Sequence, residues 1–149
     1  KVTLPNGVVL EAYKGGIEDL LVAFLNDPAA QAGKDNWFDF NDLNFEFGTA
    51  KIVPDSRKEV DNIVQILKAY PKVKIKIGGY TDKVGDEAAN KKLSGERASA
   101  VATALKDAGV GAQVEGSEGY GSQFAKYPAD APEADRVKDR RVSVSVRAK

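Results

Sequence analysis

Along the chain, segments in which hydrophobic residues recur at every second position are interspersed with segments in which they recur every three to four positions. The first pattern predicts strands and the second predicts helices. Residues 72–80 alternate strictly, with apolar side chains at the odd positions 73 to 77 and lysines between them, as in a strand with one buried face. Apolar positions in 60–67 and in 87–108 recur every three to four residues, which is typical of amphipathic helices. Strand-like segments follow at 112–119 and 140–148. We interpret the lysines of 72–80 as a solvated face; a lysine binding stripe is the less favoured alternative.

Two further signals precede the first long helix. Phe38 and Phe40 alternate with polar residues, and so do Leu43, Phe45 and Phe47, but the phase slips between the two groups. This pattern predicts two strand pieces separated by a bulge or a turn. The segment 56–59 (Ser-Arg-Lys-Glu) has the spacing of a capping box, so we expect the helix to begin there.

The order of these elements predicts an α/β (α+β) two-layer sandwich. Its core would be β-α-β-α-β-β, with helices packed on one face of a mixed four-stranded sheet. Residues 1–36 precede this pattern: Asn6-Gly7 predicts a hairpin, and 17–25 has the apolar spacing of a short helix. We therefore expect an N-terminal extension, 1–36, packed on a domain that spans 37–149.

Composition narrows the classes of function. The 149 residues carry 22 basic and 22 acidic side chains, which disfavours a general nucleic-acid binder with its excess of basic residues. Cysteine and histidine are both absent, which excludes disulfides, thiolate catalysis, histidine triads and zinc-finger sites. No apolar run reaches the length of a membrane span, so we expect any membrane anchor to lie upstream of Lys1.

Two residues of opposite charge are candidates for a binding site. Asp82 follows the strand 72–80 directly, where α/β sheets commonly bind ligands. Asn90, Leu93 and Arg97 share one face of the next helix, and a guanidinium beside an apolar stripe needs a partner. Two interpretations remain open. In the first, Asp82 and Arg97 form an internal ion pair with each other. In the second, they form a split site for a zwitterion, in which Arg97 binds the carboxylate of the ligand and Asp82 accepts hydrogen bonds from its ammonium group.

Three segments resemble the OmpA-like peptidoglycan-binding family. They are G-x-T-D-x-x-G at 79–85, N-x-x-L-S-x-x-R-A at 90–98, and D-R-R-V at 139–142, with G-x-G at 119–121 between them. The likeness covers about two thirds of the chain, from Phe45 to Val146. Two departures stand out: the family often has Asn where Asp139 stands, and several relatives carry a polar residue in place of Gly48.

The resemblance implies a ligand and a set of residues that bind it. The ligand would be the diaminopimelate of the peptidoglycan stem peptide, with Asp82 on its ammonium group and Arg97 on its carboxylate. The residues implied to line or border this pocket are Asp82, Arg97, Asn90, Leu93, Thr81, Arg140, Phe47 and Gly48. Asp139, beside Arg140, would weaken the pull of that arginine on an anionic ligand.

The implied function is recognition without catalysis, with no cofactor and no metal. The chain would bind peptidoglycan non-covalently and tether an outer-membrane protein or lipoprotein to the wall in the periplasm. One alternative is an envelope scaffold or a stator-type domain for which protein partners matter more than the wall. A wall hydrolase is a third, disfavoured hypothesis, because the acidic residues after Gly111 lie in solvated, loop-like sequence.

Overall fold

The fold is described from a computed structural model, which describes residues 1–12, 14–41 and 43–149. The strands are β1 (Val2–Thr3), β2 (Val9–Leu10), β3 (Phe38–Asp39), β4 (Lys74–Tyr80), β5 (Val114–Gly119) and β6 (Arg141–Ala148). The α-helices are α1 (Ile17–Asn26), α2 (Arg57–Ala69), α3 (Glu87–Leu105) and α4 (Glu133–Arg136). Short helical turns cover Pro54–Ser56, Lys106–Val110 and Gly111–Gln113.

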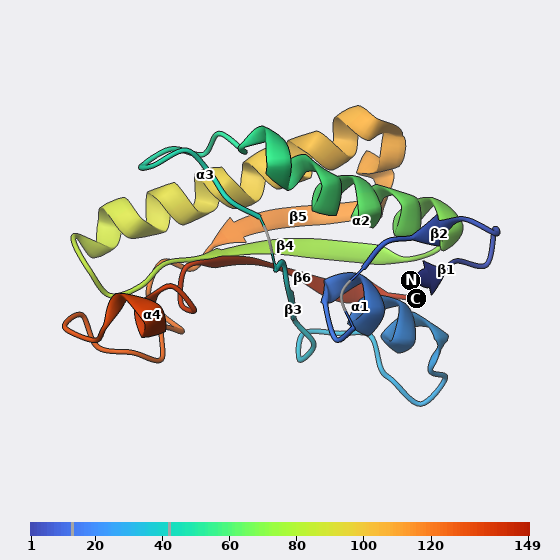
Figure 1. The fold of residues 1–149 in the computed structure, drawn as a ribbon, viewed down its shortest axis with the longest axis horizontal. Coiled ribbons are helices and arrows are strands. Elements are labelled where there is room, and N and C mark those ends of the chain that lie inside the picture. The colour runs from blue at the N-terminus through green and yellow to red at the C-terminus, as the bar shows by residue number, and fades with distance from the viewer. Residues whose placement is uncertain (13, 42) are drawn as a thin grey trace.

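A four-stranded mixed sheet forms the centre of the molecule, with the strand order β3-β6-β4-β5. β4 is parallel to β5 and antiparallel to β6, and β3 is antiparallel to β6. α2 and α3 cover one face of this sheet, while α1 and α4 lie on the other face at opposite ends (Figure 1). The predicted fold class, a two-layer α+β sandwich with a mixed four-stranded sheet, is confirmed.

The core lies between the sheet and the helices that cover it. The alternation in β4 and β6 and the helical spacing in α2 and α3 direct one apolar row from each element inward. The large side chains that are fully buried in these rows are Val60, Ile63, Ile66, Leu67, Ile75, Ile77, Val101, Leu105, Val144 and Val146. Each such side chain contributes about 1.5–3 kcal/mol through its removal from water.

Glycines set how closely α3 approaches the sheet. A Cβ added to Gly79 on β4 would lie 2.1 Å from the carbonyl oxygen of Ser94 on α3. A Cβ at Gly119 on β5 would lie 2.2 Å from the backbone nitrogen of Gly95. The helix backbone therefore rests directly on the two strands, and this contact places Arg97 of α3 at the same end of the molecule as the residues that follow β4.

The region before α2 differs from the sequence prediction in two respects. Of the two predicted strand pieces, the first forms β3, but the second makes only an isolated bridge between Phe45 and Ile52. Asp42, where the phase slips, lies outside the described residues. The capping box is also wrong: Ser56 Oγ accepts a hydrogen bond from Asn44 N, and Glu59 Oε1 accepts one from Asn41 N. Both side chains hold the preceding segment rather than the start of α2.

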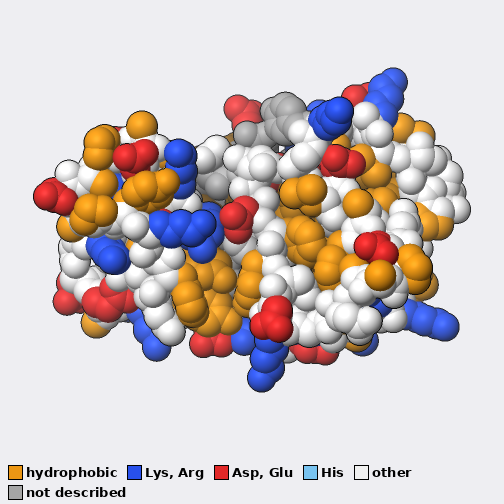
Figure 2. Space-filling model, turned by 90° about the horizontal axis from the view of Figure 1, so that it is seen from below, with side chains coloured by type: hydrophobic (Ala, Val, Ile, Leu, Met, Phe, Trp, Pro, Cys, Tyr) orange, Lys and Arg blue, Asp and Glu red, His pale blue; other side chains and the backbone are white. Residues whose placement is uncertain are grey.

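The N-terminal residues contribute to the same core as the sheet. β1 and β2 form the predicted hairpin, and Leu4, Leu10, Ile17 and Leu21 belong to the main hydrophobic cluster. The face that α2 and α3 leave open carries two lobes, with α1 at one end and the α4 region at the other, and hydrophobic side chains lie between them (Figure 2). None of the helices in the described parts of the chain is long and apolar enough to cross a membrane.

Candidate functional site

Asp82 lies two residues beyond the end of β4, where it is 6 % exposed. One carboxylate oxygen, Oδ2, accepts hydrogen bonds from Arg140 Nη1 at 2.6 Å and from Arg136 Nη1 at 3.4 Å. The other, Oδ1, accepts the backbone N–H of Val84 at 3.0 Å. The carboxylate is thus oriented by the turn that follows it and by two guanidinium groups that approach from the C-terminal part of the chain.

The environment of Asp82 favours its charged form. Burial by itself raises the pKa of this carboxyl group, but the hydrogen bonds from Arg140 and Val84 and the positive charges of Arg140 and Arg136 outweigh it. The net pKa of Asp82 lies below its ordinary value. Asp82 is therefore an anion at neutral pH and can accept hydrogen bonds from a cationic ligand group.

A short helix supplies charges on the other side of the site. Glu133, at the start of α4, pairs with Arg140 Nη2 at 2.7 Å and with Arg136 Nη1 at 3.7 Å. Arg136 is also fixed by a hydrogen bond from its Nε to the carbonyl oxygen of Ala131, at 2.8 Å. Two arginines and two carboxylates therefore form one connected network beyond the end of the sheet.

Arg97 approaches from α3 and is half-buried. Its Nε donates a hydrogen bond to the carbonyl oxygen of Thr49 at 2.8 Å, and its guanidinium lies 4.9 Å from the ring centre of Phe45. Burial, and after it the positive charge of Arg140, lower the pKa of Arg97. Among the described residues, no carboxylate lies within ion-pair distance of Arg97.

Of the two interpretations left open by the sequence, the internal ion pair between Asp82 and Arg97 is therefore wrong. Asp82 is held by Arg140 and Arg136, whereas Arg97 turns toward Thr49 and Phe45. The physical reason is that Arg136, at the end of α4, and Arg140, just before β6, already pair with this carboxylate. Arg97 and Arg140 instead repel each other, so an anion bound between them would gain energy from both charges.

Thr81, Asn90 and Leu93 border this network. Thr81 N donates to the carbonyl oxygen of Gly121 at 2.8 Å, and Thr81 Oγ1 donates to the carbonyl oxygen of Asp82 at 2.9 Å. Asn90 Nδ2 donates to the carbonyl oxygen of Val84 at 2.9 Å, which ties the start of α3 to the Asp82 turn. Leu93 is half-buried on the same helix, between Asn90 and Arg97.

Phe47 and Gly48 lie in the turn that supplies the partner of Arg97. Thr49 N donates to the carbonyl oxygen of Glu46 and closes this turn, and Gly48 adopts a φ of 69° that favours glycine. Phe47 is fully exposed to solvent in this turn. The turn thus stands beside Arg97, but neither residue contacts the Asp82 network.

Comparison with known proteins identifies the family. Residues 44–140 match the model of the OmpA family. The chain belongs to the OmpA family. It is 35% identical over 122 residues to the outer-membrane lipoprotein YfiB of Pseudomonas aeruginosa, covering 74% of this chain and 71% of that protein. It is 36% identical over 107 residues to outer membrane porin F of Pseudomonas fluorescens, covering 72% of this chain and 32% of the porin. The chain thus spans about a third of the length of that porin.

Solved structures of the same family have the same fold. The peptidoglycan-associated lipoprotein of Burkholderia pseudomallei is 28% identical, with a TM-score of 0.62 over 83% of this chain and 98% of that one. A periplasmic domain of Helicobacter pylori MotB is 25% identical, with a TM-score of 0.64 over 76% and 82% of the two chains. The family resemblance read from the sequence is therefore confirmed.

The role of Asp139 in the structure differs from the prediction. Asp139 is 1% exposed, and its two oxygens accept the backbone N–H groups of Lys126 and Tyr127 at 2.9 and 3.0 Å. Its carboxylate therefore faces the loop 122–138. The predicted weakening of Arg140 by Asp139 is not what the structure shows, because Arg140 makes its ion pairs with Asp82 and Glu133.

Sequence reasoning missed three residues of the site: Arg136, Glu133 and Phe45. The loop that carries the first two has no periodic pattern, and its only local signal is the sequence Pro132-Glu133 followed by Arg136, which suits a short helix with an i,i+3 ion pair. Phe45 was read as a strand residue. Its place beneath Arg97 follows from the turn 46–49, which no motif marks.

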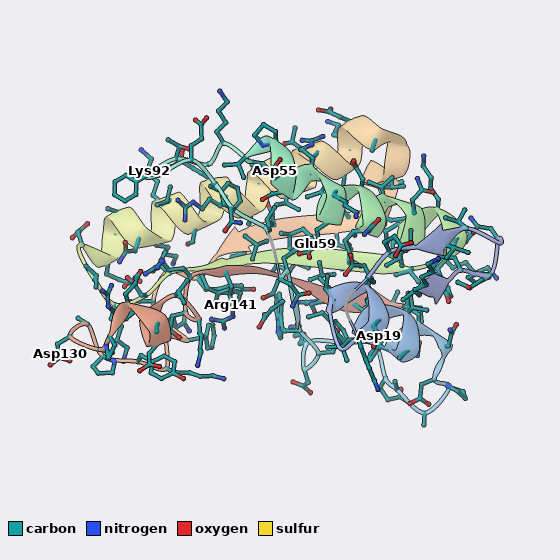
Figure 3. The ribbon with its side chains drawn as sticks, in the orientation of Figure 1. Asp19, Asp55, Glu59, Lys92, Asp130 and Arg141 are labelled. Carbon is teal, nitrogen blue, oxygen red and sulfur yellow. The ribbon has the colours of Figure 1, made fainter. Side chains whose placement is uncertain are left out.

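The side chains gathered here suit recognition of a small zwitterion. They offer one charged acceptor, Asp82, and one guanidinium without an ion-pair partner among the described residues, Arg97. A second guanidinium, that of Arg140, pairs with Asp82. No group of three or more potential metal-ligating side chains is found in the part of the chain that the structure describes. Figure 3 shows side chains between the start of α3 and α4.

Proposed function

We propose that this chain binds peptidoglycan non-covalently through the diaminopimelate of the stem peptide. Membership of the OmpA family supports the wall as the partner, since one similar structure is that of a peptidoglycan-associated lipoprotein. The observation that carries the ligand assignment is the charge arrangement beyond β4. There Asp82 and Arg97 present opposite charges without pairing with each other, and the charge of Arg140, which pairs with Asp82, also acts on Arg97.

The carboxylate of the ligand would lie between Arg97 and Arg140. In the free protein the charge of Arg140 lowers the pKa of Arg97, which means that the two cations repel each other. An anion placed between them removes this repulsion and accepts directed hydrogen bonds from the free guanidinium N–H groups. Arg97 is well placed for this role, because Thr49 occupies only its Nε and leaves both Nη atoms available.

The ammonium group would be accepted by Asp82. To bind there, it displaces the longer contact from Arg136, at 3.4 Å, and shares the carboxylate with Arg140. Arg136 keeps its ion pair with Glu133 and its hydrogen bond to Ala131 when this happens. The exchange therefore leaves neither arginine without a partner, which keeps its cost low.

No step of this function requires a covalent reaction. The chain would act as a tether that holds an outer-membrane protein or lipoprotein to the wall on its periplasmic side, in line with the outer-membrane relatives. A single site gives modest affinity, and the many stem peptides of the wall supply avidity. A second candidate, a stator-type or scaffold role with protein partners, is favoured only by the likeness to the MotB periplasmic domain.

Co-sedimentation with purified sacculi tests the proposal. The native protein should pellet with sacculi, free diaminopimelate at millimolar concentration should release it, and no soluble muropeptides should appear. Arg97→Ala should remain in the supernatant. Lys92→Ala is the matched control, since it removes an exposed cation from the same helix and should bind as the native protein does. Undiminished binding of Arg97→Ala, or no competition by diaminopimelate, would contradict the ligand assignment.

A further inference from the structure

A second concave surface lies on the sheet face opposite α2 and α3. It is a groove of about 640 Å³, which is within the usual size range of ligand sites. Its walls are aromatic, and its rim is basic. The aromatic lining residues are Trp37, Tyr80, Tyr120 and Phe124, and the basic ones include Lys34, Lys126 and Arg147. Arg141, another lining residue, extends from β6 on this side of the sheet (Figure 3).

The aromatic side chains form one packed cluster. Tyr80 and Tyr120 stack with ring centres 5.3 Å apart, and Trp37 meets both edge to face, at 6.2 and 5.9 Å. Phe124 closes the cluster at 5.5 Å from Tyr120 and is 50% exposed. This geometry gives the groove a rigid apolar wall with part of its ring surface open to solvent.

Glycine at the centre of β4 makes room for this cluster. A Cβ at Gly78 would lie 2.9 Å from Trp37 and 3.0 Å from Tyr120. The rings therefore rest on the sheet backbone itself. This finding also corrects the interpretation of the lysine face of β4 as simply solvated, because Lys76 pairs with Glu118 at 2.7 Å and lies beside the ring of Tyr120.

The charges around the groove do not cancel. Arg141 is balanced by Asp39 at 3.4 Å, and Lys76 by Glu118. Lys34, Lys126 and Arg147 have no ion-pair partner within the described ranges 1–12, 14–41 and 43–149. Arg147 lies over Trp37, 5.6 Å from its ring centre. Blue and orange side chains meet on this face in Figure 2. The surface thus suits an anionic ligand with flat apolar faces.

The groove continues from the strands that carry the Asp82 network. Tyr80 pairs with Arg141 across β4 and β6, and these residues directly precede or follow the site residues Thr81 and Arg140. A polymer fixed at Asp82 and Arg97 would therefore pass close to the groove. This continuity favours another part of the same polymer over an unrelated acidic protein segment.

We infer that the groove is a second peptidoglycan subsite that binds the glycan strand. Sugar rings have an apolar C–H face, which would stack on the exposed ring of Phe124 and on the open part of the half-buried Trp37 ring. The free lactyl carboxylates of muramyl residues that carry no stem peptide would face Lys34, Lys126 and Arg147. The inference rests on the proposed function, but it assigns a different part of the wall polymer to a different surface of the protein.

Trp37 is the only tryptophan in the chain, so its fluorescence reports directly on the groove. The probe is peptide-free glycan strands, which an amidase releases from sacculi with free lactyl carboxylates. These strands should change the Trp37 emission in a saturable way, whereas free diaminopimelate should leave it unchanged. The Asp82→Ala protein should respond to glycan strands as the native protein does, because the strands lack the stem peptide.

Two substitutions of exposed residues test the groove further. Phe124→Ala and Lys126→Glu should each bind glycan strands about three- to tenfold more weakly. Leu20→Ala and Lys72→Glu are the controls and should bind normally. Leu20, at 49%, is as exposed as Phe124, and Lys72 is an exposed cation that does not line the groove.

The outcomes separate the two proposals. No emission change with glycan strands, or undiminished binding by Phe124→Ala and Lys126→Glu, would overturn the subsite and leave an acidic protein segment as the better occupant. Sacculus binding that still depends on Arg97 would meanwhile keep the proposed function intact. Failure of the Arg97 test with a normal glycan response would instead overturn the diaminopimelate assignment and retain the groove.

Discussion

Two carboxylates lie buried at the same end of the sheet, and they are held in different ways. Asp139 is fixed by two backbone N–H groups of the loop 122–138, at 2.9 and 3.0 Å. Asp82 is held mainly by the guanidinium groups of Arg140 and Arg136, which are long and partly exposed side chains. Backbone donors cannot move away without unfolding the loop, whereas arginines can rearrange. Asp139 thus serves the fold, and Asp82 can exchange partners with a ligand.

The comparison shows that burial alone does not distinguish a structural acid from a binding acid. Both residues are less than a tenth exposed. The two residues differ in the groups that donate hydrogen bonds to them, and in whether those donors keep another acceptor when the carboxylate is no longer available. Arg140 retains Glu133 at 2.7 Å when Asp82 takes a new partner, whereas the N–H groups of Lys126 and Tyr127 would lose their acceptor without Asp139.

The largest expected effect is on binding, from Asp82→Asn. This variant keeps the shape of the side chain but removes the charge that accepts an ammonium group. Affinity for soluble stem-peptide fragments should fall at least about 30-fold, because a buried charge partner is worth about 2–5 kcal/mol. Calorimetric titration measures this loss. The unfolding free energy should change by only about 1 kcal/mol, since Arg140 retains Glu133; a larger change would mean that Asp82 is structural.

The next effect is on stability, from Asp139→Ala. It leaves two buried N–H groups without their acceptor and should lower the free energy of unfolding by about 2–4 kcal/mol. Urea titration followed by circular dichroism measures this change. Asp139→Asn keeps one amide oxygen as an acceptor and should lose less. If Asp139→Ala were as stable as the native protein but failed to bind sacculi, the roles assigned to the two acids would be reversed.

A smaller effect should appear in the pH dependence of stability. The folded pKa of Asp82 lies below its ordinary value of 3.8, so the unfolded chain takes up a proton at this group more readily. Its contribution to stability is therefore complete above about pH 5 and is lost as the pH falls below 3.8 through the folded pKa. Urea midpoints measured from pH 6 to pH 3 should fall less steeply in Asp82→Asn, by about the contribution of one such group. Identical slopes would show that Asp82 does not titrate as described.

The smallest effect is expected from Arg136→Gln. Its contact with Asp82 is long, at 3.4 Å, and in our proposal the ligand displaces it. Without the Arg136 guanidinium, which competes with the ligand for Asp82, stem-peptide fragments should bind more tightly, but by less than about threefold. Arg140→Gln, which removes the 2.6 Å contact and a ligand-binding cation, is the comparison and should weaken binding. A tenfold loss in Arg136→Gln would make Arg136 a direct ligand contact.

Much of this molecule could be predicted from local patterns. The alternation in 72–80 and 140–148 predicted β4 and β6, and the helical spacing after 56 and 86 predicted α2 and α3. The Asp82 and Arg97 motifs predicted the family. The segment 43–47 was harder, because its alternation is as clear as that of β3 but it forms only an isolated bridge, between Phe45 and Ile52, outside the four-stranded sheet.

The sequence by itself determined the periodic elements, the apolar rows that form the core and the residue types of the site, because these depend on backbone geometry and side-chain chemistry within a few neighbouring positions. Only the tertiary structure decided which arginine meets Asp82. The partners Arg136 and Arg140 lie 54 and 58 residues away along the chain. Arg140 comes close to Asp82 because it directly precedes β6, the strand that pairs with β4. Arg136 comes close because it lies in the loop 122–138, which the hydrogen bonds of Asp139 close. Such contacts depend on how the elements pack, and no local pattern records them.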